Sequence, residues 1–292
     1  MRFIETSLLR VGYEEWNPSG ARTILLLHGW PDSLRSWSGV ALVLADAGWR
    51  VIAPALRGFN PTTFLRADTP RTGQLAALGR DLVELVHALG LDRPALVGHD
   101  WGARAVANAA GLVPEIASHL VFISVGYGTN DPAQALSLEQ ARNFWYHWYM
   151  ATPRGERSVR DDRRGFAQIM WDTWSPAGWY DPAELDATAA AFENPDWADI
   201  VLHSYRHRWG HAPGDPAYAA DDAALTPAPI LHLPTLMLHG AVDTCVLPSS
   251  SAGKERFFTG RYHRALIDGA GHFPQREAPS AVAAALLAFL TA

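Results

Sequence analysis

The sequence predicts an α/β fold: a mainly parallel sheet of eight strands with helices on both faces and a helical cap inserted after the sixth strand. Short apolar runs bounded by turn residues alternate with longer helical patterns, which is typical of parallel strands joined by crossover helices. This alternation lapses between residues 125 and 234, where seven of the twelve tryptophans occur. The lapse predicts a separate layer of helices over one core, which suits the length of the chain.

The apolar runs and helical periodicities place the individual elements along the chain. The first sixteen residues alternate polar and apolar side chains and predict an antiparallel pair at the sheet edge. Further strands are expected at residues 24–27, 51–53, 95–97, 120–124, 235–238 and 263–267. Helices are expected at residues 34–47, 72–89, 102–111, 248–258 and 279–290.

The same pattern predicts two domains. Residues 1–127 and 228–292 form the core domain, and residues 128–227 form the cap. Turn-forming residues occur at both junctions, with Asp131-Pro132 on one side and Thr226-Pro227 on the other. Such dipeptides are typical of loops between domains.

The composition limits the possible partners and location. Hydrophobic residues make up 48% and charged residues 18%, which indicates a folded globule, and the formal net charge of −6 leaves no basic surface for nucleic acid. The single cysteine, Cys245, excludes an internal disulfide framework. The start of the sequence lacks a signal-peptide pattern, and the apolar stretch at residues 281–290 is too short to span a bilayer. We therefore expect a cytoplasmic monomer or homodimer with no membrane partner.

The sequence Gly-His-Asp-Trp-Gly at residues 98–102 lies where a strand passes into a helix. Small residues on both sides of a central residue permit a strained turn that exposes its side chain, while neighbouring backbone N–H groups form an oxyanion hole. Asp100 occupies this central position, and an ionised carboxylate is already a nucleophile that suits saturated carbon. The alternative is an ordinary turn in which Asp100 caps the helix.

Three further loops favour the catalytic interpretation. His-Gly-Trp-Pro at residues 28–31 follows a strand and offers the N–H of Trp30 to an oxyanion hole shared with the N–H of Trp101. Asp243 and His272 follow two later strands, which gives the order nucleophile, acid, base along the chain. Because the carboxyl ends of parallel strands meet at one edge, we expect Asp100, Asp243 and His272 to form a catalytic triad.

On these motifs, and from the first strand to the last helix, the chain resembles the α/β-hydrolase superfamily, and residues 28–31 and 99–102 look like its epoxide hydrolase and dehalogenase branch. The resemblance implies the α/β-hydrolase fold and an alkyl-enzyme ester. Asp100 would be the nucleophile, His272 the base that activates water, and Asp243 the acid that orients His272.

Opening an epoxide releases an alkoxide, which needs a proton donor. The resemblance assigns this role to two cap tyrosines, Tyr146, with Tyr149 as its substitute, and Tyr205. Tyr205 also falls on the apolar stripe of a helix that begins after residue 195 and ends at Gly210, so it should point inward. The alternative for both is a packed core tyrosine whose hydroxyl bonds to the backbone.

Dehalogenase features provide a second hypothesis with the same triad. His147-Trp148 with Tyr205 resembles the halide-binding group of fluoroacetate dehalogenases, and Arg104 matches one of the two arginines that bind their substrate carboxylate. Trp101 replaces the other arginine, although it would suit the halide site of haloalkane dehalogenases.

A third hypothesis is a ligand-binding relative that keeps the fold without turnover. The intact triad argues against it. The favoured prediction is therefore an epoxide hydrolase that forms a vicinal diol from a small apolar or aromatic substrate.

We expect neither a cofactor nor a metal, because the histidines include no HExxH pattern. The residues expected to contact the substrate are His28, Pro31, Arg104, Trp148, Tyr149 and Phe273.

Overall fold

The computed structural model describes residues 1–129 and 135–291. Asp131-Pro132, expected at the start of the cap, lies outside the described residues.

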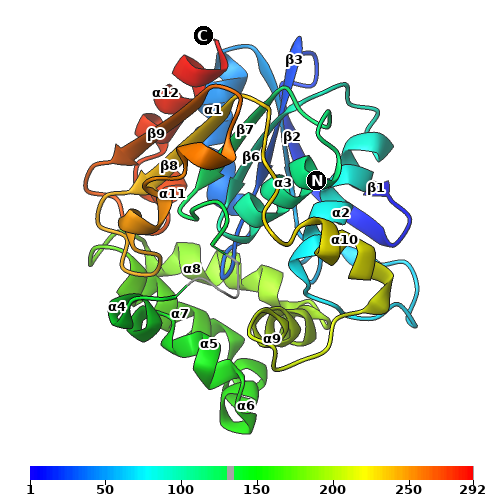
Figure 1. The fold of residues 1–292 in the computed structure, drawn as a ribbon, viewed down its shortest axis with the longest axis vertical. Coiled ribbons are helices and arrows are strands. Elements are labelled where there is room, and N and C mark those ends of the chain that lie inside the picture. Colours follow the sequence, from blue (N-terminus) through cyan, green and yellow to red (C-terminus); the bar gives the residue numbers. More distant parts are fainter. Residues whose placement is uncertain (130–134, 292) are drawn as a thin grey trace.

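A nine-stranded sheet forms the centre of the fold, in the order β1-β2-β4-β3-β6-β7-β8-β9 with β5 paired to β2 (Figure 1). From β4 to β9 neighbouring strands are parallel, whereas β1, β2 and β5 pair in antiparallel fashion at one edge. The strands are β1 (Arg2–Glu5), β2 (Leu9–Trp16), β3 (Arg22–Leu27), β4 (Trp49–Pro54), β5 (Thr63–Phe64), β6 (Ala95–His99), β7 (His119–Ile123), β8 (Thr235–Gly240) and β9 (Tyr262–Ile267).

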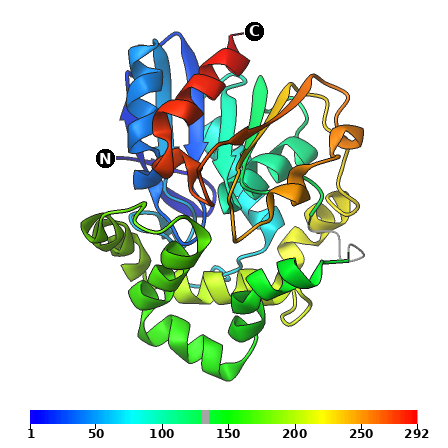
Figure 2. The ribbon, with the colours of Figure 1, turned by 90° about the vertical axis from the view of Figure 1, so that its left-hand side faces the viewer.

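Helices cover both faces of this sheet (Figure 2). On one face α1 (Ser38–Asp46) packs against α12 (Pro279–Leu290), and on the other α2 (Leu75–Ala88) packs against α3 (Trp101–Leu112). The central strands are buried almost throughout and consist mainly of apolar residues, as is typical of parallel strands. Short helices complete the core: 3₁₀ helices η1 (Leu34–Trp37), η4 (Pro248–Ser251) and η5 (Glu255–Phe257), and α11 (Pro274–Glu277).

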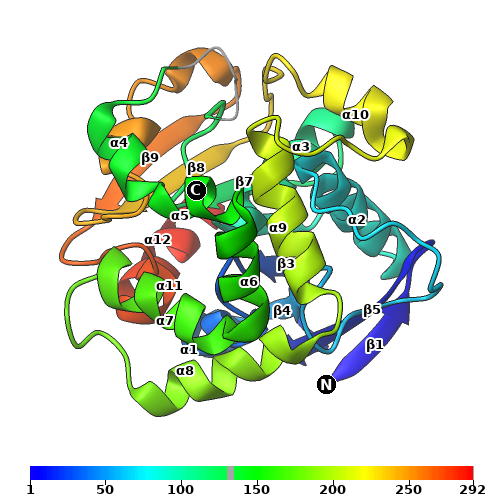
Figure 3. The ribbon, with the colours of Figure 1, turned by 90° about the horizontal axis from the view of Figure 1, so that it is seen from below.

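Between β7 and β8 the chain forms a run of helices that gathers below one end of the sheet (Figures 1 and 3). They are α4 (Leu138–Asn143), α5 (Trp145–Met150), α6 (Pro153–Asp161), α7 (Arg163–Trp174), α8 (Pro182–Ala189), η2 (Ala190–Glu193), α9 (Trp197–Arg208), η3 (Pro216–Tyr218) and α10 (Ala219–Ala224). We call residues 138–224 the helical insertion. Its final helix, α10, packs against α3 of the core, and the division into domains at residues 127 and 228 stays a prediction.

The expected fold class is correct, with two local differences. The sequence did not indicate β5, because a strand of two residues is too short to show a periodicity. With this additional strand, the insertion follows the seventh observed strand and not the sixth. The helix expected at residues 248–258 is wrong: η4 and η5 stand there, separated by Gly253 at a φ of +67°. A left-handed residue cannot continue a helix.

The apolar stretch near the end of the sequence forms α12, whose 12 residues match the expected bounds. No helix in the described ranges is long and apolar enough to cross a membrane.

A buried ion pair ties the helical insertion to the core. Arg276 in α11 binds the carboxylate of Asp32, which follows β3, through Nε and Nη2 at 3.0 and 2.6 Å. Its Nη1 donates to Glu184 of α8 at 2.9 Å. The Asp32 side chain is fully buried and that of Arg276 is 8% exposed, so removal of either partner leaves a buried charge.

We predict that Arg276→Ala lowers the free energy of unfolding by about 3–5 kcal/mol, because Asp32 loses its counter-ion in a fully buried site. Denaturant unfolding followed by circular dichroism measures this change. Arg66→Ala is the matched control, since Arg66 pairs with Asp68 on an exposed surface and should leave the midpoint unchanged. Equal effects of the two substitutions would contradict the prediction.

Candidate active site

Asp100 lies in a sharp turn between β6 and α3. Its backbone has a φ of +49° and a ψ of −111°, a conformation that costs a residue with a side chain about 1–3 kcal/mol. The turn needs glycine on both sides: a Cβ on Gly98 would lie 2.1 Å from the carbonyl oxygen of Gly102, and a Cβ on Gly102 would lie 2.2 Å from that of Leu27. The sequence therefore folds this segment so that residue 100 alone projects from the turn.

The carboxylate of Asp100 points away from the helix behind it. Its Oδ1 accepts a hydrogen bond from the N–H of Trp30 at 2.9 Å, and among the described residues it makes no capping bond to α3. Gly29 permits this approach, because a Cβ there would lie 2.5 Å from the Cβ of Asp100. The alternative interpretation of Asp100 as a helix cap is wrong.

His272 and Asp243 lie beside Asp100, on the loops that follow β9 and β8. The Nδ1 of His272 donates to Oδ2 of Asp243 at 2.9 Å. Its Nε2 lies 4.0 Å from Oδ2 of Asp100 and has no hydrogen-bond partner in the described part of the chain. The structure thus brings together the three side chains that were expected to form the triad.

Four donors hold the carboxylate of Asp243. Its Oδ1 accepts the N–H groups of Cys245 and Val246 at 2.8 and 3.0 Å, and its Oδ2 accepts His239 Nε2 at 3.1 Å in addition to His272. Burial favours the neutral acid, but the charge of His272 and the hydrogen bonds from His239 and His272 outweigh it and hold the pKa of Asp243 below its usual value. Asp243 therefore stays ionised beside the imidazole of His272.

The pKa of His272 is shifted upward. Burial opposes the charged form, but the negative charge of Asp243, its hydrogen bond and the charge of Asp100 outweigh burial. The imidazole therefore gains a proton more readily than an isolated histidine, which suits a general base.

The backbone around His272 is fixed by side chains that the sequence did not indicate. Glu277 accepts the N–H groups of Gly271 and Phe273 at 2.6 and 2.8 Å. His99 Nε2 and Ser124 Oγ both donate to the carbonyl oxygen of His272, at 2.7 and 2.9 Å. The position of the imidazole thus depends on residues at the ends of β6 and α11 and just after β7.

An aromatic wall faces Asp100. The ring of Trp30 contacts those of Tyr146 and Tyr205, with centroids 5.5 and 5.1 Å apart. The hydroxyl of Tyr205 accepts a hydrogen bond from Trp101 Nε1 at 3.2 Å, and that of Tyr146 lies 3.6 Å from the sulfur of Cys245. Both tyrosines point inward, as expected for Tyr205. Burial above all raises the pKa of Tyr146 and of Tyr205 well above the usual value, so both remain protonated donors at neutral pH.

His147 is a further donor in this wall. Trp209 Nε1 donates to its Nδ1 at 3.0 Å, which places the ring proton on Nε2. This Nε2 is buried without a partner among the described residues, and the ring lies 4.6 Å from that of Tyr205. Burial, together with the charges of Arg208 and Arg104, lowers the pKa of His147 well below the usual value, so it is neutral. The sequence indicated His147 only for a halide site.

Two of the expected substrate contacts lie elsewhere. Trp148 is 38% exposed, packs on Trp209 and donates its indole N–H to the carbonyl oxygen of Ala141. Tyr149 bonds Ser158 through its hydroxyl at 2.8 Å. Trp148 is turned away from Tyr146, because residues two positions apart point to nearly opposite sides of a helix. The hydroxyl of Tyr149 is instead occupied by Ser158 of α6.

The other residues that were expected to contact the substrate lie nearer to the triad. Both ring nitrogens of His28 are used by backbone groups, at Gly29 and Leu56, so the ring supports the loop. Pro31, joined to Trp30 by a cis peptide bond, accepts Trp171 Nε1 through its carbonyl oxygen. The ring of Phe273 packs edge-on against that of His272.

Arg104 is buried one turn into α3, 7% exposed. Burial and the nearby charge of Arg208 lower its pKa to about 10, so it is charged at neutral pH. Within the described ranges, no three His, Cys, Asp or Glu side chains gather as metal ligands would.

Comparisons with known proteins agree with this geometry. A family model of the α/β-hydrolase fold matches residues 22–279. Epoxide hydrolase A from Mycobacterium tuberculosis is 30% identical over 99% of this chain and 97% of its own length. A solved structure from Klebsiella pneumoniae, assigned as an epoxide hydrolase, is 36% identical with a TM-score of 0.92 and covers 98% of this chain and 96% of its own. Epoxide hydrolase A from Mycobacterium thermoresistibile is 25% identical with a TM-score of 0.77, over 99% and 97% of the two chains.

We predict that Asp243→Asn lowers the pKa of His272. The substitution removes the negative charge and the charge-assisted hydrogen bond, whereas the burial that opposes protonation remains. NMR titration of the imidazole resonances measures the pKa in the wild type and the variant, with circular dichroism to confirm folding. An unchanged or higher pKa in the folded variant would contradict this electrostatic account.

Proposed function

The chain belongs to the α/β-hydrolase fold family, and from this premise we propose that it hydrolyses an epoxide to a vicinal diol through an ester with Asp100. The observation that carries the proposal is the pairing of a carboxylate that projects from a strained turn with a histidine base 4.0 Å away, beside two protonated tyrosines. The fold and the resemblance to epoxide hydrolases expected from the sequence are both confirmed. The full-length relatives that carry this name support the activity.

In the first step Oδ2 of Asp100 attacks one carbon of the epoxide. This oxygen lies 4.0 Å from His272 Nε2, whereas Oδ1 is held by the N–H of Trp30. A carbon–oxygen bond forms to Asp100 while the ring carbon–oxygen bond breaks, and its electron pair stays on the epoxide oxygen. Tyr205 and Tyr146 donate hydrogen bonds and a proton to that oxygen, as their raised pKa values permit.

In the second step His272 removes a proton from water, and the hydroxide attacks Cγ of the Asp100 ester. Negative charge develops on Oδ1, where the N–H of Trp30 already donates, and the N–H of Trp101 is proposed as the second donor. Asp243 stabilises the imidazolium that forms. Collapse of the intermediate expels the diol oxygen, which takes the carboxyl proton and leaves Asp100 as a carboxylate. The proton held by His272 then returns through solvent to the tyrosine that protonated the epoxide oxygen.

The dehalogenase hypothesis has weaker support in the geometry. Trp101 Nε1, the donor that would suit a halide, is bonded to the hydroxyl of Tyr205. Ser124, where the acid of fluoroacetate dehalogenases would follow its strand, binds the backbone of His272 instead. An alkoxide needs a proton donor such as the two protonated hydroxyls of this wall, whereas a halide does not.

We further propose that residues 128–227 act as a cap that closes over the triad and that the protein works in the cytoplasm as a monomer or homodimer. The buried ion pair between Arg276 and Asp32, extended to Glu184 of α8, supports a cap that is held firmly to the core.

We predict that Asp100→Ala abolishes turnover, whereas His272→Gln still forms the ester but cannot hydrolyse it. Intact-protein mass spectrometry after incubation with styrene oxide should show an adduct on the His272→Gln variant and none on Asp100→Ala. Turnover by Asp100→Ala, or a folded His272→Gln variant that never acquires the adduct, would reject the mechanism.

We predict that Tyr205→Phe slows epoxide opening by roughly a hundredfold, because the alkoxide loses a positioned proton donor. Stopped-flow measurement of the tryptophan fluorescence change on ester formation gives this rate.

Tyr149→Phe is the matched control for the tyrosine substitution, since its hydroxyl bonds to Ser158 away from Asp100. It should leave the opening rate unchanged. Equal rates for Tyr205→Phe and the wild type would exclude Tyr205 as a donor.

A further inference from the structure

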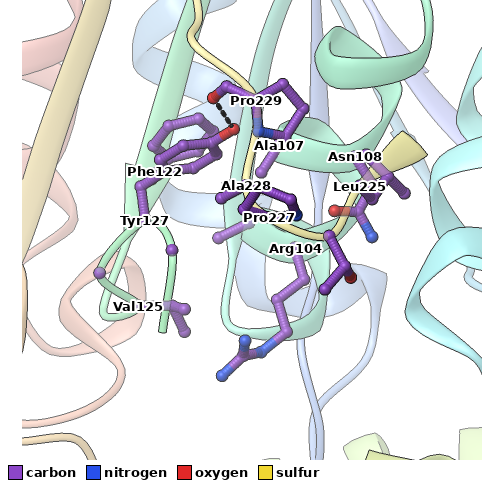
Figure 4. A pocket seen from close by; sticks show the side chains of 14 residues that line it. Arg104, Ala107, Asn108, Phe122, Val125, Tyr127, Leu225, Pro227, Ala228 and Pro229 are labelled. Carbon is purple, nitrogen blue, oxygen red and sulfur yellow. Dashed lines mark hydrogen bonds between the residues drawn. The ribbon is translucent and has the colours of Figure 1, made fainter. Parts of the chain in front are cut away.

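A cavity of about 570 Å³ lies beside the candidate active site, between α3, the ends of α4, α5 and α9, and the loop after β8. This volume falls in the range of small-molecule sites. Asp100 is not among the lining residues, but the cavity adjoins the site, because His147 lines it and contacts the ring of Tyr205. A smaller cavity of about 60 Å³ on the other side of Arg104, near the contact between Tyr127 and Pro229, is too small for a substrate (Figure 4).

The larger cavity combines an apolar wall with two cations. Arg104 and Arg208 both line it, and no acidic residue occurs among its described lining residues. The lowered pKa of Arg104, caused by burial and then by the charge of Arg208, indicates that the two like charges interact. The apolar part of the wall consists of Leu136, Phe144, Trp209, Val246 and Leu247.

Arg208 carries the clearest sign of a missing partner. Its Nε and Nη2 are buried and have no hydrogen-bond partner in the described part of the chain. These two nitrogens form the edge of the guanidinium that binds a carboxylate with two parallel bonds. The same edge binds a carboxylate in this way at the pairs Arg35–Glu184 and Arg57–Asp81.

Arg208 is also placed next to the reacting groups. It lies three residues after Tyr205 on α9, so both side chains share one face of the helix. Its guanidinium carbon is 4.8 Å from the centre of the Tyr205 ring. Among the described residues, His147 Nε2 and His272 Nε2 are likewise buried without hydrogen-bond partners, so unsatisfied nitrogens occur both in the triad and beside the cavity.

We propose that the substrate is an epoxide that also carries a carboxylate, which binds Arg208 in the cavity with Arg104 adding positive charge, while the epoxide reaches Asp100. This inference rests on the proposed function and names its substrate class. The apolar wall holds the hydrocarbon chain between the two polar ends. The binding edge of Arg208 is covered in this structure. Side chains at the cavity therefore have to shift before a substrate can enter.

The test compares terminal-epoxide fatty acids of increasing chain length with their methyl esters, which differ only in charge. The wild type should prefer the best acid over its ester by about tenfold or more in kcat/KM, since a hydrogen bond to a charged group contributes that much. In Arg208→Ala the ratio of acid to ester should fall to about one, and Arg208→Lys should keep part of the preference.

Arg142→Ala is the matched control, because it removes the same charge from an exposed site on neighbouring α4. It should keep the wild-type ratio. Equal kcat/KM for acid and ester in the wild type, or a ratio unchanged by Arg208→Ala, would overturn the inference while diol formation from the esters leaves the proposed function standing.

Calorimetric titration with saturated fatty acids tests the anion site without any epoxide chemistry. The wild type should bind them and Arg208→Ala should bind at least about tenfold more weakly. If neither acids nor esters are hydrolysed, the proposed function fails, yet this titration still decides on the anion site. No binding, or binding equal in the folded variant, would overturn it.

Discussion

The turn at Asp100 is the constraint on which the rest of the structure depends. A residue with a side chain adopts a φ of +49° here, and the turn closes this tightly because Gly98 and Gly102 lack a Cβ that would clash with a neighbouring carbonyl oxygen. The turn lifts one carboxylate out of the sheet and directs it to the N–H of Trp30. The strain is sustained by the buried parallel strands on both sides, which makes the position of the nucleophile a property of the whole sheet.

The groups around this carboxylate differ in charge state because their surroundings differ. Asp243 stays ionised through four donors, His272 gains basicity from two carboxylates, and the tyrosines keep their protons in an apolar wall. In the proposed mechanism, one side of the site accepts a proton from water and the other supplies one to a leaving oxygen. Hydrolysis in two steps needs both, and the helical insertion provides the second side.

The sequence predicts the fold, and the closeness of Asp100, Asp243 and His272, because both depend on local patterns: glycines around Asp100, and polar loops after apolar strands. It expects a substrate contact of Trp148, which is 38% exposed, and gives His147 only a halide-binding role, because the register of a six-residue helix, α5, is not defined by periodicity. His239 in β8, Glu277 in α11 and Arg208 in α9 act through individual side-chain contacts. Of these three residues, only Arg208 could have been found from the sequence. It follows Tyr205 by three positions, so the two side chains share one face of the helix. The prediction of a helix at residues 248–258 is wrong because Gly253, at a positive φ, interrupts the segment.

The covalent role of the residue-100 carboxylate is most directly tested by a single turnover, with enzyme in excess, in water enriched in the heavy oxygen isotope. Attack by the protein predicts that the first diol carries no heavy oxygen, while the peptide containing Asp100 gains one heavy atom from the water that cleaves the ester. A diol labelled in that first turnover, with an unlabelled peptide, would mean that water attacks the epoxide directly and would contradict the account.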